Sequence, residues 1–173
     1  MEEFSNWLSG LALSDAIRAR DWAIPTIQSV HIVGIGVVIS SIFMIDLRVM
    51  GWGGPSQTLA QTTRRFAPWL WSALVVLVLT GSLLLIAEPH RQLFSLSFWI
   101  KMSFLLIGII VAAIFQTSLR RNETYWEESA ATRHRTKVLG IVTFLIWCVI
   151  IVMGRLIAYD AQVWGDLSPS FIS

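Results

Sequence analysis

Charged side chains are scarce in this sequence. Asp, Glu, Lys and Arg make up 14% of the 173 residues, whereas 55% of the residues are hydrophobic. Soluble domains carry about a quarter charged residues, and a chain of this length cannot bury so much apolar surface in water. The balance excludes a soluble globular protein and predicts an integral membrane protein. The nine tryptophans agree, because indole rings favour the membrane–water interface.

Cysteine and the common catalytic motifs are also nearly missing. The single Cys148 excludes an intramolecular disulfide and a Cys-x-x-Cys motif. No His-Glu-x-x-His, phosphate loop or Rossmann glycine motif occurs, which disfavours hydrolases and nucleotide-driven mechanisms. The N-terminus lacks the basic start and apolar core of a signal peptide, so we expect no cleavage there. The basic residues flank apolar segments, which predicts topology signals and no nucleic-acid partner.

Four long apolar segments are what the sequence does contain. They cover residues 25–47, 67–87, 98–119 and 138–158, and each is near the roughly 20 residues that cross a bilayer. Backbone groups in lipid must form hydrogen bonds within their own segment, so each segment predicts a helix. The predicted fold class is therefore all-α, with an integral membrane four-helix transmembrane bundle over residues 23–160.

Amphipathic or polar sequence lies on either side of this bundle. Residues 1–22 predict an interfacial segment, because apolar side chains recur at helical spacing among polar ones: Phe4, Trp7, Leu8 and Leu11. Gly10 is expected to interrupt that helix, and residues 161–173 form a short tail. Basic residues concentrate at the first and third connections between the apolar segments, residues 48–66 and 120–137. The positive-inside rule then predicts a bacterial inner-membrane protein with both termini in the periplasm.

One histidine marks the candidate site. Of the three histidines, only His31 has apolar sequence on both sides, and it lies roughly 9 Å into the first segment at 1.5 Å per residue. Lys101, Arg155 and Glu88 fall in the same predicted half of the membrane, although they belong to other segments. Charged groups within a span are costly unless they are paired or hydrated. The four residues are therefore the candidate cofactor-binding set.

Structural interpretations of the same residues remain open. Lys101 and Arg155 lie near the interface, where long side chains extend to water. Glu88 is equally typical of a solvated loop. His31 needs only one donor and one acceptor, which Gln28 one turn earlier or a backbone carbonyl across the bundle would provide.

Two further pairs have structural interpretations. Asp46 and Arg48 are interpreted as interface anchors or a local ion pair. Gly36 and Ser40 form a small-xxx-small pair, which predicts close helix contact.

Several functions are compatible with the cluster. Haem b would use His31 as its axial ligand, with Arg155, Lys101 or Arg91 near the propionates. A quinone would use His31 and a carboxylate such as Glu88 to bind its carbonyls. Copper passage is an alternative, with His31 as the tentative metal ligand and scattered methionines as further ligands. An accessory subunit of a larger complex, or a homo-oligomer without chemistry of its own, is the remaining alternative, so enzymatic activity stays open.

The chain also resembles known families over three stretches. These are HIVGIGVVISSIFMIDLRVMG (31–51), RRFAPWLWSALVVLVLTGSLLLIAEP (64–89) and FWIKMSFLLIGII (98–110). They resemble a family of small bacterial four-helix inner-membrane proteins known as a domain of unknown function, which implies a fold and no activity. The third stretch is similar, more distantly, to copper-resistance-D-type membrane proteins. The pair His31 and Lys101 resembles one in HemJ-type protoporphyrinogen oxidases, which implies an association with haem.

Overall fold

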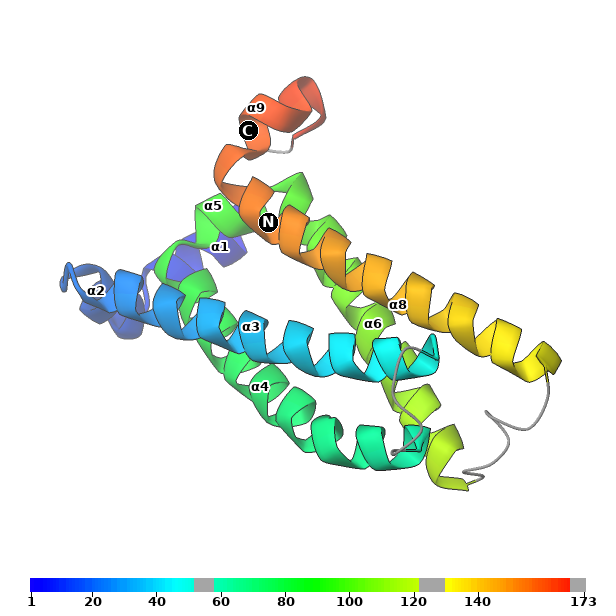
Figure 1. Ribbon diagram of the computed structural model, residues 1–173. Helices are drawn as coiled ribbons and strands as arrows, with labels where there is room; N and C mark the ends of the chain where they lie inside the picture. The colour runs from blue at the N-terminus through cyan, green and yellow to red at the C-terminus, as the bar shows by residue number, and fades with distance from the viewer. Residues whose placement is uncertain (52–57, 122–129, 169–173) are drawn as a thin grey trace.

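The computed structural model describes residues 1–51, 58–121 and 130–168, with only the backbone described over 130–133. Every element in these ranges is helical (Figure 1). In chain order the elements are α1 (Glu2–Ser9), α2 (Ala12–Arg18), α3 (Ala23–Val49), α4 (Leu59–Ala87), α5 (Pro89–Leu93), α6 (Leu96–Arg121), α8 (Ala130–Leu156), the 3-10 turn η1 (Ile157–Tyr159), α9 (Asp160–Trp164) and the 3-10 turn η2 (Gly165–Leu167). Four helical stretches are long and apolar enough to cross a membrane: Ala23–Val49, Leu59–Ala87, Leu96–Arg121 and His134–Leu167. The predicted all-α membrane bundle is confirmed.

The bundle is made of two helix pairs. α3 packs along α4, and α6 packs along α8, while α3 also packs against α8 and α4 barely touches α6. Figure 1 shows the two pairs diverging toward the end that carries α1, α5 and α9. We call this the terminal end of the bundle. At the opposite end, the end of α3 lies near the beginning of α4.

The second membrane helix is longer than its apolar stretch. It begins at Leu59 rather than at residue 67, because Thr58 and Gln61 form a capping box there. The Thr58 hydroxyl accepts a hydrogen bond from the Gln61 backbone N–H at 3.2 Å, and the Gln61 side chain accepts one from the Thr58 N–H at 3.0 Å. The polar first turns of α4 therefore stay helical beyond the apolar run from which the prediction was made.

Close packing at the centre comes from large apolar side chains and two well-placed glycines. Val38, Ile42, Leu70, Leu74 and Trp147 are among the buried residues of the main core cluster. The glycines are Gly34, which faces Leu77 of α4, and Gly140, which faces Val49 of α3.

The predicted small-residue contact is wrong. Gly36 and Ser40 are both exposed, and a Cβ added at Gly36 meets nothing within 4 Å. The i to i+4 spacing identifies a helix stripe without showing which way that stripe faces. In α3 the stripe that contains Gly34 faces α4 instead.

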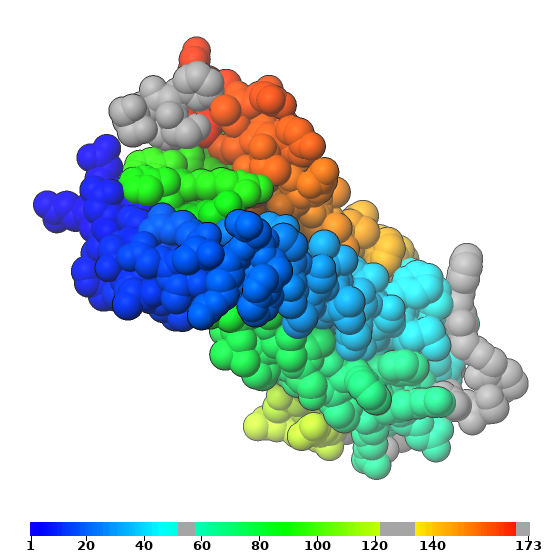
Figure 2. All heavy atoms as spheres, turned by 90° about the vertical axis from the view of Figure 1, so that its left-hand side faces the viewer, coloured from blue at the N-terminus to red at the C-terminus, as the bar shows by residue number. Residues whose placement is uncertain are grey.

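The terminal end is tied together by short helices. α1 and α2 are separated at Gly10, where the sequence predicts the interruption. α1 packs on α5 and α2 on α4, and the Ser14 hydroxyl donates to the Ile86 carbonyl at 2.7 Å. Figure 2 shows α1 and α2 beside the α5 region, with the C-terminal helices on its other side. These contacts close the end toward which the two pairs diverge.

Asp160 joins the C-terminal helices to the beginning of α6. Its carboxylate accepts hydrogen bonds from the backbone N–H groups of Leu96 and Ser97 at 3.0 and 2.8 Å. It also accepts from the hydroxyls of Ser95, at 2.8 Å, and Ser168. The first N–H groups of a helix lack partners within the helix, so Asp160 caps α6 across 64 residues of sequence.

Candidate functional site

His31 lies in α3 and faces α4. Its Nδ1 is 2.7 Å from the Thr80 hydroxyl oxygen. Thr80 is buried, and its hydroxyl also donates to the Val76 carbonyl at 2.8 Å, one turn earlier in α4. In the described residues, the hydrogen-bond partner of His31 is therefore the Thr80 hydroxyl, rather than Gln28 or a backbone carbonyl as the structural interpretation of the sequence expected.

The Thr80 contact favours one tautomer of His31. A hydroxyl has one hydrogen, and the Thr80 oxygen lies 2.8 Å from the Val76 carbonyl, to which it can donate. In that arrangement the lone pairs of the oxygen accept a hydrogen bond from Nδ1–H of His31. The neutral ring then carries its lone pair on Nε2, the nitrogen for which the described residues offer no hydrogen-bond partner. This lone pair is the one that binds a metal or accepts a proton.

Gly81 makes space for the ring. A Cβ at Gly81 would lie 3.4 Å from Cε1 of His31, which is ordinary van der Waals contact, so the ring packs directly beside this glycine. Thr80 and Gly81 therefore form the part of α4 on which the His31 ring packs. Thr80 contacts Nδ1, and Gly81 lies beside Cε1. The sequence signal was the Thr-Gly pair inside an apolar run, yet nothing in it showed which helix faces this pair.

Lys101 reaches the same part of the bundle from α6. Its side chain lies along Gly154 of α8, where an added Cβ would be 3.6 Å from both Cε and Nζ. Within the described residues, the ammonium group has no hydrogen bond or ion pair. The structure therefore places His31 and Lys101 in different helix pairs, with Lys101 packed on α8.

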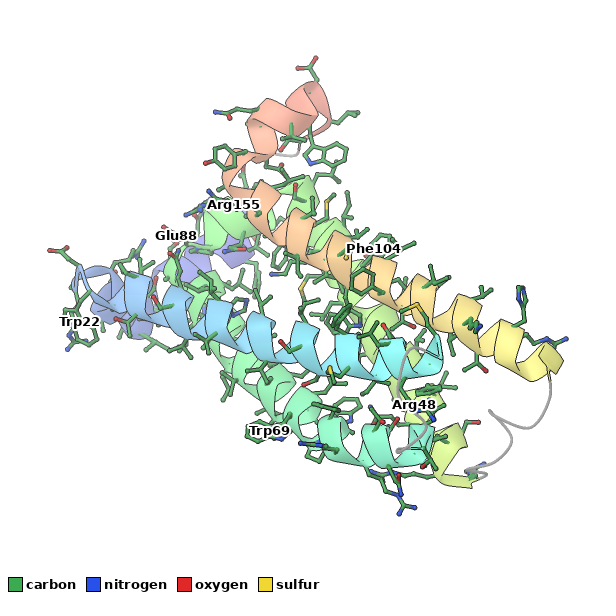
Figure 3. All side chains as sticks on the ribbon, in the orientation of Figure 1. Trp22, Arg48, Trp69, Glu88, Phe104 and Arg155 are labelled. Atoms are coloured by element: carbon green, nitrogen blue, oxygen red, sulfur yellow. The ribbon has the colours of Figure 1, made fainter. Side chains whose placement is uncertain are left out.

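Glu88 and Arg155 lie at the terminal end as predicted, but each has a local partner. Figure 3 shows both at this end, far from Arg48 at the other. Glu88 forms a salt bridge with Arg91 at 2.7 Å. Arg155 packs over the Tyr159 ring, with its Cζ 5.3 Å from the centroid, and it is exposed. No recorded contact among the described residues joins either of them to His31.

The described residues contain no group of three or more His, Cys, Asp or Glu side chains that could hold a metal ion. His90 is exposed at the terminal end, where its Nε2 is 3.1 Å from the Asn6 side-chain oxygen and its ring stacks on Phe94. Of the described histidines, only His31 is both within a membrane helix and engaged by a neighbouring helix.

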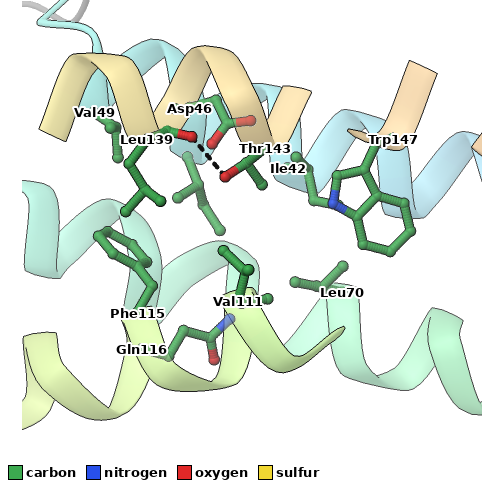
Figure 4. Close-up of a pocket in the computed structure, with 13 residues that line it drawn as sticks. Ile42, Asp46, Val49, Leu70, Val111, Phe115, Gln116, Leu139, Thr143 and Trp147 are labelled. Carbon is green, nitrogen blue, oxygen red and sulfur yellow. Dashed lines mark hydrogen bonds between the residues drawn. The ribbon is translucent and has the colours of Figure 1, made fainter. Parts of the chain in front are cut away.

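A second polar cluster lies nearer the opposite end and was interpreted differently from sequence. Asp46 was expected to be an interface anchor or to pair with Arg48, but its side chain is only 4% exposed and turns into the bundle. It lines a cavity together with Gln116 of α6 and with Thr143 and Trp147 of α8 (Figure 4). The position of Asp46 near a helix end misled the prediction, because α8 runs past that end and covers the side chain.

The fold and the site define the class of protein. It is a polytopic helical membrane protein whose intramembrane histidine is held by a neighbouring threonine and approached by a lysine. A family model described as a family of unknown function, DUF6644, matches residues 22–160, and the chain belongs to this family. The resemblance to a family without known activity is confirmed. Comparisons with curated proteins and with solved structures gave no match.

Proposed function

We propose that this is a redox-associated membrane protein that binds haem b or a quinone at His31. The observation that carries the proposal is the Nδ1 contact with Thr80, because it leaves the Nε2 lone pair for a ligand. Histidines that bind metals almost always donate their other N–H to an acceptor, which fixes the ring and raises its basicity. Thr80 takes this supporting role.

His31 and Lys101 have complementary roles in either case. With haem b, Nε2 of His31 would bind the iron and Lys101 would supply a cation for a propionate, while the group would supply one-electron chemistry. With a quinone, Nε2 would accept a hydrogen bond from a hydroxyl of the reduced form, and Lys101 would donate a hydrogen bond to a carbonyl oxygen of the oxidised form. Arg155 and Glu88 complete the proposed set as charges at the rim of the site.

A pair of histidine variants tests the proposal. The purified protein is examined by visible spectroscopy in oxidised and reduced forms, and its co-extracted quinone is measured by mass spectrometry. We expect either a Soret band or stoichiometric quinone, and we expect His31→Ala to lose it. His90→Ala is the matched control and keeps it, since that side chain lies outside the membrane helices. A protein with neither haem nor quinone above the lipid background contradicts the proposal, as does equal loss in both variants.

We place this function in a bacterial inner membrane, with both termini and the His31 half on the periplasmic side. The support is the concentration of arginine and lysine at the first and third connections. Fusions to an enzyme that is active only after export test the orientation. Activity is expected for a fusion after Ser168 and not for one after Arg121. The reverse pattern moves the His31 site to the cytoplasmic half.

An accessory role is the second candidate, and exposed aromatic side chains at the terminal end favour it. Phe4 and Trp7 stack with ring centroids 5.8 Å apart and are 52% and 61% exposed. Trp22 is also exposed at this end (Figure 3). Such side chains suit either the membrane interface or a partner protein. A partner that copurifies stoichiometrically and is lost in a Phe4→Ala/Trp7→Ala variant supports the accessory role.

A further inference from the structure

Two residues that line the same cavity, Asp46 and Trp147, each carry a buried polar atom without a hydrogen-bond partner among the described residues. Oδ2 of Asp46 and Nε1 of Trp147 are both inaccessible, and neither has a hydrogen-bond partner among the described residues. Their side chains are 4% and 2% exposed. One atom is an acceptor and the other a donor, and they come from different helices. An unsatisfied buried polar group costs about 1–3 kcal/mol. Two such groups on residues of one cavity therefore indicate that a molecule bound there forms hydrogen bonds with both.

The cavity has the size of a small hydrogen-bonding molecule. About 30 Å³ is open to the centre of a water-sized sphere, and one bound water needs roughly 10–15 Å³ by this measure. Figure 4 shows Asp46 and Thr143 on one side of the cavity, Phe115 and Gln116 on the other, and Trp147 at one end. Asp46 is the only ionisable residue in the described lining.

The chemistry of the two atoms selects the occupant. The indole N–H of Trp147 needs an acceptor, which a metal cation is not. The Asp46 oxygen accepts hydrogen bonds, which an anion or an apolar molecule does not donate. Water both donates and accepts, and two molecules fit the volume. We propose that this cavity is an internal water site that links the Asp46 carboxyl to the Trp147 indole N–H and gives the carboxyl a route for proton exchange.

A neighbouring cavity supplies the route by which this water exchanges. It lies between α4 and α6, which barely touch, and about 180 Å³ of it is open to water-sized spheres. Gln116 lines both cavities. Its side-chain oxygen accepts a hydrogen bond from the Trp71 indole at 2.8 Å. Because Gln116 is common to both cavities, the proposed route to Asp46 passes beside it. This inference does not depend on the proposed function of His31.

Infrared difference spectroscopy tests the water site. The protein in lipid nanodiscs is equilibrated in H₂¹⁶O or H₂¹⁸O, and bands of bound water are identified by their isotope shift. Asp46→Asn and Trp147→Phe are each expected to shift or remove the same water band. Trp99→Phe is the matched control, because the Trp99 indole already donates to the Leu93 carbonyl at 3.0 Å, and it leaves the band unchanged. The absence of an ¹⁸O-sensitive band that responds to both substitutions overturns the proposal.

The route has its own test. Gln116→Leu keeps a similar volume and removes the polar side chain between the two cavities. We expect the water band to exchange more slowly after mixing with H₂¹⁸O, by at least several-fold. An unchanged exchange rate in a variant that retains the band rules out passage beside Gln116.

Discussion

His31 and Asp46 lie on the same helix, yet their surroundings differ. His31 packs against α4, where Thr80 engages one ring nitrogen at 2.7 Å. Asp46 faces a cavity between α3, α6 and α8, where its Oδ2 has no protein partner among the described residues. A polar side chain held by the protein is oriented, and it presents one defined atom to a ligand. A polar side chain beside a cavity is open to a small exchangeable molecule instead.

Helix packing explains the difference. α3 and α4 pack along most of their length, whereas α4 and α6 barely touch. A tight pair brings a threonine hydroxyl within hydrogen-bond distance of an imidazole. Where α3, α6 and α8 meet beside Leu70 of α4, the side chains leave a cavity of about 30 Å³ unfilled. The bundle thus holds His31 in a defined orientation in one half and leaves Asp46 beside a cavity in the other.

The substitution with the largest expected effect tests how much the hydrogen bonds of Asp160 contribute to the stability of the terminal end. Asp160→Ala removes a carboxylate that accepts four hydrogen bonds. We expect the free energy of unfolding to fall by about 3 kcal/mol, because charged acceptors bond strongly and the N–H groups of α6 lose their cap. Thermal unfolding in detergent measures the change. Asp166→Ala, at an exposed position, is the control and is expected to be nearly neutral. Equal melting temperatures for both variants would contradict the proposed importance of the cap.

A second substitution tests whether the Asp46 region is closely packed around its cavity. A Cβ at Gly140 would lie 2.9 Å from Cγ1 of Val49, and the β-branched valine has little freedom to move. Gly140→Ala is expected to lower the free energy of unfolding by about 2 kcal/mol. Gly36→Ala is the matched control, because nothing lies within 4 Å of its added Cβ. If Gly140→Ala is as stable as Gly36→Ala, the contact between α8 and Val49 of α3 gives way to an added methyl group, and the packing beside the Asp46 cavity is not rigid.

Thr80→Val tests the contrast directly, because it makes His31 resemble Asp46. Valine preserves the shape of threonine but leaves the Nδ1–H of His31 without an acceptor. We expect a loss of about 1.5 kcal/mol in unfolding free energy and roughly tenfold weaker binding of the His31 ligand. Thr80→Ser retains the hydroxyl and is expected to preserve both. Thermal unfolding and ligand titration measure the two effects, and wild-type behaviour of Thr80→Val refutes the role assigned to the threonine.

The smallest expected effect concerns the hydrogen bond between Trp71 and Gln116, near the Asp46 cavity. Trp71→Phe removes the donor to Gln116, and a neutral hydrogen bond of this kind contributes about 1 kcal/mol. We expect a decrease of that size in thermal unfolding experiments. A much larger loss would show that the Gln116 side chain, without the Trp71 donor, is left with an unsatisfied buried polar atom, as Asp46 is.

The helices were predictable from sequence, and their rotation was not. Apolar runs identify helices in lipid because no other backbone arrangement of a single segment satisfies its own hydrogen bonds. These helices are apolar on nearly all sides, so periodicity does not reveal which face is buried. His31 was therefore identifiable by its isolation, whereas Thr80 and Gly81 required the structure. Asp46 was misjudged for the same reason, since its distance from the helix end was known and its direction was not.

The cap on α6 has a consequence for the order in which the chain is assembled. Asp160 is synthesised 65 residues after Ser95, and Ser168 follows it. Until Asp160 emerges, the backbone N–H groups of Leu96 and Ser97 at the beginning of α6 lack the carboxylate that accepts their hydrogen bonds. The cap on α6 therefore forms only after α8 has been inserted and its C-terminal end lies beside the beginning of α6. A residue synthesised late, Asp160, thus stabilises the beginning of a helix, α6, that was synthesised much earlier.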